Sequence, residues 1–339
     1  METITGEEFK KKLESLESNS FENYIVICSS ILQLDFSEII WKVYLENIIF
    51  SGQSIIFKYD NPKYQNQEIS FKNCTFHNKI IFQKCKLYSV RFENTMIKSD
   101  FKILNSEIKD LSMASLYADN LEFSIKETKF EQFLMFDCNF TSSLIDIYSI
   151  TTETLFGIYN CTLYQVKIYY SVFSQNFDYS NNQTLENGKE TFFNCRFTNA
   201  SFSSTTFSNM VSISNSVFED KTSFATIENR EAKFTISNST INHECYFDRA
   251  DIKNLHITNT KFNKDVSFQG AKFDTIRLKK LIFTDIVFFD EVEIRKVFEC
   301  DRNTLRTIKQ QLQKAENKID YNRFRSYELT AYYNELNWN

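Results

Sequence analysis

The chain has 339 residues, of which only five are glycine and one is proline, where average usage would supply roughly 24 and 17. Collagen-like, mucin-like and Gly/Ser-linker structures are therefore excluded, because all of them need glycine or proline. With 42% hydrophobic and 16% aromatic residues, the bulk of the chain can bury a core. The net charge of −5 comes from 39 basic and 44 acidic residues, and this mild, mixed balance leaves no basic footprint for nucleic acid.

The N-terminal residues predict a helix that covers one end of the fold. Thr5 to Glu8 fit a capping box, and Phe9, Leu13 and Leu16 follow at helical spacing. We therefore assign residues 1–20 to an amphipathic capping helix, with a partner-binding helix as the alternative. The first residues contain no apolar signal segment, and no window reaches the ~18 uninterrupted apolar residues of a membrane span, so we expect the chain as given to be soluble.

Large apolar residues then recur every five positions, as at Phe192, Phe197, Phe202 and Phe207. Neither a helix nor a simple strand has this period, and sustained self-similarity at a fixed period is the signature of a solenoid. A small residue, often cysteine, lies two positions before many of the large ones. We expect both to point inward, and we assign these residues to the core: Phe76, Leu87, Phe92, Phe140, Leu163, Phe197, Phe202, Phe207, Phe262, Phe268, Phe273, Phe283, Phe288, Cys74, Cys138, Cys161, Cys195 and Cys245.

Tetrads that begin with asparagine set the length of one coil. N-C-T-F at 73–76, N-C-R-F at 194–197 and six similar tetrads are often separated by 10–11 or 21–23 residues. Four five-residue steps plus one or two residues therefore make one coil, and two inserts, near 59–68 and 174–190, interrupt the pattern. The eight cysteines contain no C-x-x-C pair, which indicates free thiols in a reducing compartment that act as small buried hydrophobes.

The small-x-large pattern resembles that of the pentapeptide-repeat family, in degenerate form. The resemblance covers residues 70–299 and, more weakly, 21–69. It implies that residues 21–300 form an all-β solenoid, a right-handed quadrilateral parallel β-helix in which four five-residue faces make one coil. Coils of this kind stack as parallel strands ~4.8 Å apart, and each coil buries its neighbours. We expect about twelve coils, with the N-terminal helix before them and a helical hairpin at residues 301–339 after them.

The period of five ends at Asp301. Leu305, Ile308 and Leu312 indicate one helix, and apolar residues from Ile319 onward indicate a second, which together make a helical hairpin.

This tail also carries a second resemblance. R-x-x-K at 306–309, N-x-x-D at 317–320 and Glu328 resemble a helical segment that leads from the solenoid into membrane spans in many bacterial pentapeptide-repeat membrane proteins. The resemblance implies a cytoplasmic protein at the inner face of a membrane. The sequence leaves open whether the chain is a natural soluble form or the soluble part of a longer membrane protein.

Residues that could carry chemistry are scattered. The histidines His77, His243 and His256 form no pair at metal spacing, and the sequence contains no phosphate-binding loop and no nucleophile elbow. The carboxylate pairs worth weighing for polysaccharide cleavage are Asp285 with Asp290, Glu291 with Glu293, and Asp248 with Asp251. Outward charges on a solenoid are normally solvated surface, so we predict no catalytic, cofactor-binding or metal-binding residue and no enzymatic activity.

The favoured function is a non-enzymatic protein-interaction scaffold, or a sensor or docking module, because solenoids present extended binding surfaces. The two inserts and the tyrosine-rich segment 159–179 are the candidate recognition elements. We expect a protein partner, a possible homo-oligomer and no direct binding of nucleic acid. The alternatives are a DNA mimic that binds topoisomerase, which needs a strongly acidic face, and a β-helix carbohydrate-active enzyme.

Overall fold

The computed structural model describes residues 1–15, 19–35, 42–59, 67–297 and 299–336. They form a parallel β-solenoid of about 13 turns with one short N-terminal helix and two C-terminal helices, which confirms the predicted fold class. The chain divides into two compact units, Met1–Ser174 and Gln175–Asn339. Within each unit, every strand pair that the structure describes is parallel. One coil takes 21 to 23 residues in most of the chain, as between Glu107 and Lys129 or between Asp251 and Lys272, and up to 26 near the N-terminus, as between Val43 and Ile69.

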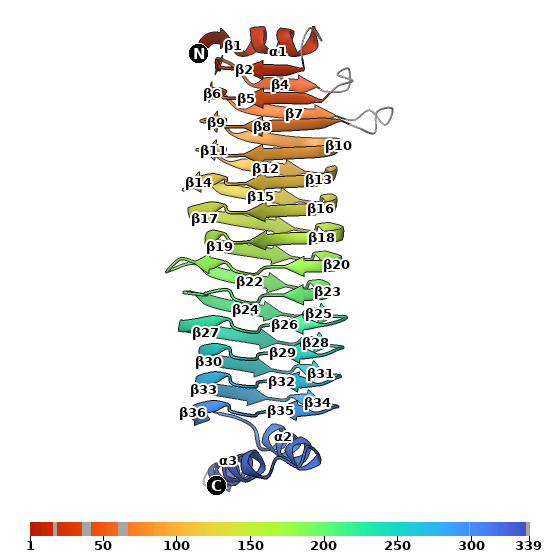
Figure 1. Ribbon diagram of the computed structural model, residues 1–339, viewed down its shortest axis with the longest axis vertical. Helices are drawn as coiled ribbons and strands as arrows, with labels where there is room; N and C mark the ends of the chain where they lie inside the picture. Colours follow the sequence, from red (N-terminus) through yellow and green to blue (C-terminus); the bar gives the residue numbers. More distant parts are fainter. Residues whose placement is uncertain (16–18, 36–41, 60–66, 298, 337–339) are drawn as a thin grey trace. The chain divides into compact units, whose positions relative to one another are not determined.

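The first unit contains one helix, α1 (Gly6–Glu14), which follows its first strand, and its strands stack coil upon coil (Figure 1). Its strands are β1 (Glu2–Thr5), β2 (Ser20–Glu22), β3 (Tyr24–Cys28), β4 (Leu32–Asp35), β5 (Val43–Glu46), β6 (Ile49–Gly52), β7 (Ile55–Tyr59), β8 (Glu68–Lys72), β9 (Thr75–Phe76), β10 (Ile80–Glu93), β11 (Met96–Ile97), β12 (Phe101–Leu104), β13 (Glu107–Ala114), β14 (Tyr117–Asp119), β15 (Glu122–Lys126), β16 (Lys129–Phe136), β17 (Asn139–Tyr148), β18 (Thr151–Tyr159), β19 (Thr162–Tyr169) and β20 (Val172–Asp178), within which the boundary falls.

The second unit ends with the helices α2 (Arg302–Lys314) and α3 (Lys318–Leu336). Its strands are β21 (Gln183–Thr184), β22 (Lys189–Phe193), β23 (Arg196–Ser201), β24 (Met210–Ser214), β25 (Val217–Phe218), β26 (Thr222–Ser223), β27 (Glu228–Ser237), β28 (Thr240–Ile241), β29 (Cys245–Tyr246), β30 (Asp251–Thr258), β31 (Lys261–Phe262), β32 (Val266–Ser267), β33 (Lys272–Lys279), β34 (Ile282–Phe283), β35 (Val287–Phe288) and β36 (Glu293–Val297).

The asparagines that open the repeated tetrads mark corners of the coils. Asn73, Asn94, Asn105, Asn160, Asn194, Asn215, Asn238 and Asn259 all have φ between 48° and 56°. This left-handed conformation is costly for most L-residues. It costs least for glycine, which has no Cβ, and for asparagine, whose short polar side chain bonds locally. In a chain with five glycines, asparagine therefore supplies these corners, and the following small residue turns inward.

Columns of stacked aromatic rings fill the interior. In the second unit Phe202, Phe224, Phe247, Phe268 and Phe289 form one such column, with neighbouring ring centroids 4.9 to 5.1 Å apart. Each ring is buried. Since offset or stacked aromatic pairs contribute about 0.5–1.5 kcal/mol beyond area burial, the same side chains that fill the core also hold one coil against the next.

One residue assigned to the core from the sequence is wrong. Phe288 is only half-buried, and its neighbour Phe289 points inward and stacks on Phe268 at 4.9 Å. The step from Phe283 to Phe289 is six residues, as is the step from Phe262 to Phe268 one coil earlier, and Phe288 lies opposite Ser267. The other seventeen core assignments are buried: Phe76, Leu87, Phe92, Phe140, Leu163, Phe197, Phe202, Phe207, Phe262, Phe268, Phe273, Phe283, Cys74, Cys138, Cys161, Cys195 and Cys245.

Of the two inserts expected from the sequence, the structure describes the second, near 174–190, but little of the first. Residues 60–66, most of the insert expected near 59–68, lie outside the described residues. The insert expected near 174–190 contributes to the interior: Phe177, Tyr179, Thr184 and Glu190 are all buried. Tyr179 lies 5.6 Å from the ring of Phe192, so it is a core residue and not part of a recognition surface. Of the same tyrosine-rich segment, Tyr170 is 47% exposed.

The N-terminal helix covers the first coils of its own unit. Thr5 and Glu8 form the predicted capping box, in which the Glu8 amide donates to Thr5 Oγ1 and the Thr5 amide donates to Glu8 Oε2. Phe9 and Leu13 are buried, and the Phe9 ring packs edge-on at 5.5 Å from Phe50. Apolar residues on one helical face thus close what would otherwise be an exposed core. Leu16 lies outside the described residues.

The cysteines behave as small core residues. All eight are free thiols, and seven are fully buried. The Sγ of Cys74 donates to the carbonyl of Leu45 and the Sγ of Cys138 donates to that of Met113, each on the preceding coil. Burial raises the pKa of the Cys74 thiol to about 11, so this thiol stays protonated and unreactive near neutral pH.

Candidate functional site

The C-terminal hairpin is fastened to the last coils by its first residue. Asp301 caps α2, because its carboxylate accepts from the Thr304 amide at 2.9 Å and from Thr304 Oγ1 at 2.7 Å. The same carboxylate accepts from the Lys280 amide at 2.6 Å, and Thr304 Oγ1 accepts from the Leu281 amide at 3.1 Å. One capping residue thus satisfies both the helix and the corner of the preceding coil.

The start of α3 is fixed to the corner that precedes β36. Asn317 caps α3 by accepting from the Asp320 amide at 3.1 Å, and its side-chain amide donates to Asp290 at 3.2 Å. Arg323 donates to the carbonyl of Val292 at 2.8 Å. Phe324 is buried 4.7 Å from Phe289, at the end of the aromatic column. The N-x-x-D pattern therefore caps and positions the second helix.

The two helices are held together by one nearly buried carboxylate. Glu328 of α3 accepts from Arg306 Nε at 3.0 Å and from Lys309 Nζ at 2.5 Å, both on α2. Burial alone would raise the pKa of Glu328, but the hydrogen bonds from Lys309 and Arg306 outweigh it and lower that pKa. R-x-x-K and Glu328, which the sequence marked as one motif, thus form one ion-pair cluster between the helices.

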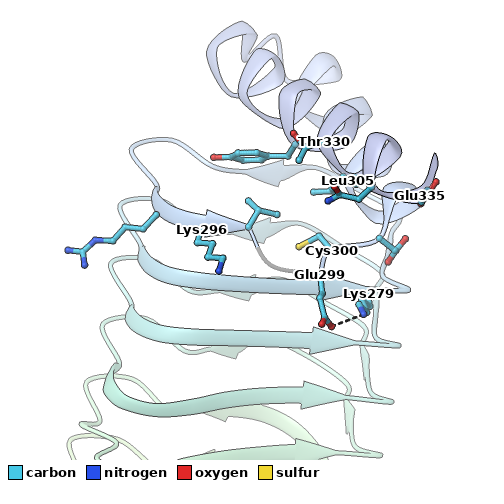
Figure 2. Close-up of a pocket in the computed structure, with 13 residues that line it drawn as sticks. Lys279, Lys296, Glu299, Cys300, Leu305, Thr330 and Glu335 are labelled. Carbon is cyan, nitrogen blue, oxygen red and sulfur yellow. Dashed lines mark hydrogen bonds and ion pairs between the residues drawn. The ribbon is translucent and has the colours of Figure 1, made fainter. Parts of the chain in front are cut away.

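A cleft of about 990 Å³ lies between the last coil and α3 (Figure 2). Its coil side is formed by Lys279, Arg295, Lys296 and Val297, followed by Glu299, Cys300 and Asp301. Its helix side is formed by Leu305, Tyr327, Thr330, Ala331, Asn334 and Glu335. The volume lies at the upper end of the range for ligand sites, and the lining mixes apolar and charged side chains.

The reactive groups of the cleft are held by hydrogen bonds. The Cys300 thiol donates to the Ile276 carbonyl and accepts from the Leu278 amide at 3.2 Å, and burial raises its pKa to about 12. Glu299 accepts from Lys279 at 3.1 Å, and this hydrogen bond lowers its pKa. Because the Cys300 thiol is protonated and the Glu299 carboxylate is paired with Lys279, neither is available as a nucleophile or base. The cleft is therefore suited to binding a ligand by its shape and charge.

Two rows of alternating charge run along neighbouring coils and end at β36. The first row is Asp251, Lys272 and Glu293, and the second is Lys253, Asp274 and Arg295. Within them Lys272 lies 3.2 Å from Glu293 and Arg295 lies 3.0 Å from Asp274. Both rows line a smaller hollow of about 380 Å³ on the coil surface, and Arg295 also borders the cleft.

The other candidates from the sequence are not gathered into one site. His256 lies half-buried between Leu255 and Ile257, and burial lowers its pKa to about 4, helped by the charges of Lys233 and Arg277. His243 lies 3.8 Å from Asp220, and His77 is exposed.

The carboxylate pairs weighed for catalysis are also separated by their hydrogen bonds. Asp290 accepts from Gln269 and Asn317, and Asp285 accepts from the amide of Ile286. Asp248 accepts from Ser267, and Asp251 accepts from Arg230 at 3.1 Å. Of the third pair, Glu293 lies 3.2 Å from Lys272 on the preceding coil and Glu291 is exposed. Asp248, Asp251, Asp290 and Glu293 thus bond to neighbouring coils or to the hairpin. Among the described residues no group of three histidines, cysteines or acids could hold a metal ion.

Two features escaped the reading of the sequence. The roles of Glu293 and Arg295 become visible only when charges are compared at the coil spacing, where Asp251, Lys272 and Glu293 alternate in sign. Glu190, a fully buried carboxyl group, lay within an expected insert and therefore carried no sequence signal.

Comparison with known proteins found no matching family model, curated protein or solved structure. Within the described part of the chain, none of the helices combines the length and the apolar character that crossing a membrane requires.

Proposed function

We propose that this protein is a non-enzymatic interaction scaffold of the pentapeptide-repeat type that binds a partner protein at its C-terminal end. The observation that carries the proposal is the cleft between β36 and α3. The five-residue periodicity and the inward Phe and Cys residues support the repeat type, and the solenoid fold is compatible with a scaffold.

The way α3 is held supports a binding role for the cleft. The first half of the helix is fixed to the corner at Asp290 and Val292, and its second half meets α2 through Glu328. The cleft is lined by the part of the helix that begins beside the second support, from Tyr327 to Glu335. A rigid frame around an open cleft keeps the entropy cost of binding low, because few groups must be ordered.

The alternatives gain less from the structure. A DNA mimic needs a face of one sign, whereas the described surface pairs opposite charges from coil to coil, as between Lys86 and Glu107 or between Lys109 and Glu131. A carbohydrate-active enzyme needs free carboxylates in a groove, whereas Asp248, Asp251, Asp290 and Glu293 are bonded to neighbouring coils or to the hairpin. The likeness of the tail to segments that precede membrane spans supports a partner at the cytoplasmic face of a membrane.

Site-specific photo-crosslinking in cells of the native source tests the proposal. A benzoylphenylalanine at Asn334, which lines the cleft, should give one discrete adduct with a partner protein, and the same residue at exposed Lys261 on the coils should give none. Absence of an adduct at Asn334, or equal adducts at both positions, would contradict a binding site at this end.

A further inference from the structure

The last coil carries charges that lack the neighbour that every earlier member of their row has. In each row a charged side chain lies in register with the opposite charge on the next coil, and the last two members of each row form ion pairs, Lys272 with Glu293 and Asp274 with Arg295. Glu293 and Arg295 are the last members, and their side chains are 68% and 81% exposed. These are the two highest exposed fractions among the ion-paired side chains of the described residues. The rows therefore end on charges that a further strand would cover.

The backbone of β36 is open on the same side. Among the described strands β36 pairs only with β33. The Glu293 amide donates back to the carbonyl of Ala271 at 2.9 Å, and neighbouring residues in a parallel strand direct their peptide groups to opposite sides. Ile294 therefore presents its N–H and C=O to the open edge, which is the geometry that an added strand needs.

Space for an added strand exists beside this edge. The cleft continues from Arg295 and Val297 to α3, which lies above Lys296 and Cys300 in Figure 2. On the helix side Tyr327 and Ala331 offer apolar contact. An extended peptide that lies between a sheet edge and a helix gains affinity from main-chain hydrogen bonds and specificity from alternate side chains.

We propose that β36 accepts an extended segment of the partner protein as one more parallel strand, and that this segment reads basic–apolar–acidic–any–apolar. This inference rests on the proposed function and names the chemistry of the partner. The basic residue of the segment lies opposite Glu293, and the acidic residue lies opposite Arg295. With these charges the segment continues the alternation of sign in both rows.

The apolar positions follow from the interior columns. Ile252 and Phe273 are buried in register with Ile294, and Leu255 and Ile276 are buried in register with Val297. A segment that continues these columns needs apolar side chains at its second and fifth residues.

The chain itself shows that this pattern matches β36. On its other side β36 (Glu-Ile-Arg-Lys-Val) pairs in parallel with residues 272–276, whose sequence is Lys-Phe-Asp-Thr-Ile. That five-residue sequence fulfils every position of the proposed pattern. It therefore serves as the probe for the open edge.

Fluorescence anisotropy with the intact chain tests the inference. A labelled peptide that contains Lys-Phe-Asp-Thr-Ile should bind more tightly than one that contains Asp-Phe-Lys-Thr-Ile, by roughly tenfold for two matched cross-strand charge pairs. The double variant Glu293→Lys/Arg295→Glu should reverse this preference. The matched control Arg196→Glu, which alters another exposed ion pair of the same unit, should leave the preference unchanged.

Each result decides the matter. Equal binding of the two peptides, or a preference that survives the double variant, overturns the inference. If circular dichroism shows the double variant unfolded, Glu293→Gln/Arg295→Gln replaces it and should abolish the preference. Self-association of the unmodified protein that the peptide displaces would assign the edge to a second copy and overturn the inference.

The two proposals fail in different ways. Crosslinking at Asn334 without peptide binding would leave the scaffold intact and refute strand addition alone. Loss of both would refute the scaffold at this end.

Discussion

Glu190 should make the stability of the second unit depend on pH in a way that one substitution removes. The side chain lies inside the solenoid on β22 and is fully buried, and neither carboxyl oxygen has a hydrogen-bond partner among the described residues. Burial raises its pKa from 4.5 to about 8. Folding therefore keeps a proton on Glu190 at pH values where the unfolded chain has released it.

The sign and the size of the effect follow from linkage. Between pH 4.5 and 8 the folded state binds more protons than the unfolded state, so stability falls as the pH rises through this window and levels off above it. At 1.36 kcal/mol for each unit of pKa difference, Glu190 lowers the free energy of unfolding by about 3 kcal/mol between pH 5 and pH 8. Glu190→Gln keeps the shape of the side chain and removes the titration.

Urea denaturation followed by circular dichroism at pH 5, 6, 7 and 8 measures the difference between the two proteins. Subtracting the free energy of unfolding of the unmodified protein from that of the variant at each pH cancels the contributions of the other titrating groups. This difference should rise by about 3 kcal/mol from pH 5 to pH 8. Glu231→Gln, at an exposed glutamate of the same unit, should give a flat difference. A flat difference for Glu190→Gln as well would show that this carboxyl group does not titrate as its burial requires.

Four further outcomes are expected. Phe289→Ala should lower the free energy of unfolding by about 3–5 kcal/mol and Phe288→Ala by less than half as much, and equal losses in urea denaturation would contradict the register of the last coil. Asn215→Gly should be tolerated in its left-handed corner whereas Asn215→Ala should cost about 1 kcal/mol; the reverse order would refute the role of that φ. The Cys300 thiol should resist iodoacetamide at pH 8 until the protein is unfolded, and rapid labelling of the folded chain would contradict its raised pKa. Glu328→Gln should speed amide hydrogen exchange in α2 and α3 because Arg306 and Lys309 lose their shared acceptor, while unchanged exchange would show that the ion pairs do not hold the hairpin.

The architecture was predictable because one physical requirement repeats along the chain. A coil of this size must turn an apolar side chain inward at every face, so residues such as Phe197 and Phe202 recur at steps of five. The helical ends were predictable for the opposite reason, since the period changes there to the helical spacing of Leu305, Ile308 and Leu312. Those three residues are fully buried against the solenoid.

The misplaced residues lie where local geometry overrides the period. At the last corner two adjacent phenylalanines are equally apolar, and only the stacking of Phe289 on Phe268 selects one of them. The polarity of the segment around Glu190 suggested a surface insert, although its backbone continues the coil and carries the carboxyl group inward. The cleft arises from how α3 crosses β36, which depends on contacts between residues far apart in sequence, such as Arg323 and Val292.

Because neighbouring coils lie in register, a deletion in the gene that removes one whole coil can leave the rest of the solenoid intact. A deletion of residues 251–271 would remove one whole coil and bring Lys272 opposite Glu228, since each of them pairs with Asp251. The new neighbours have opposite charge, and the inward positions stay inward. A chain built this way can therefore lose or gain one whole coil in a single event and keep the following faces in register.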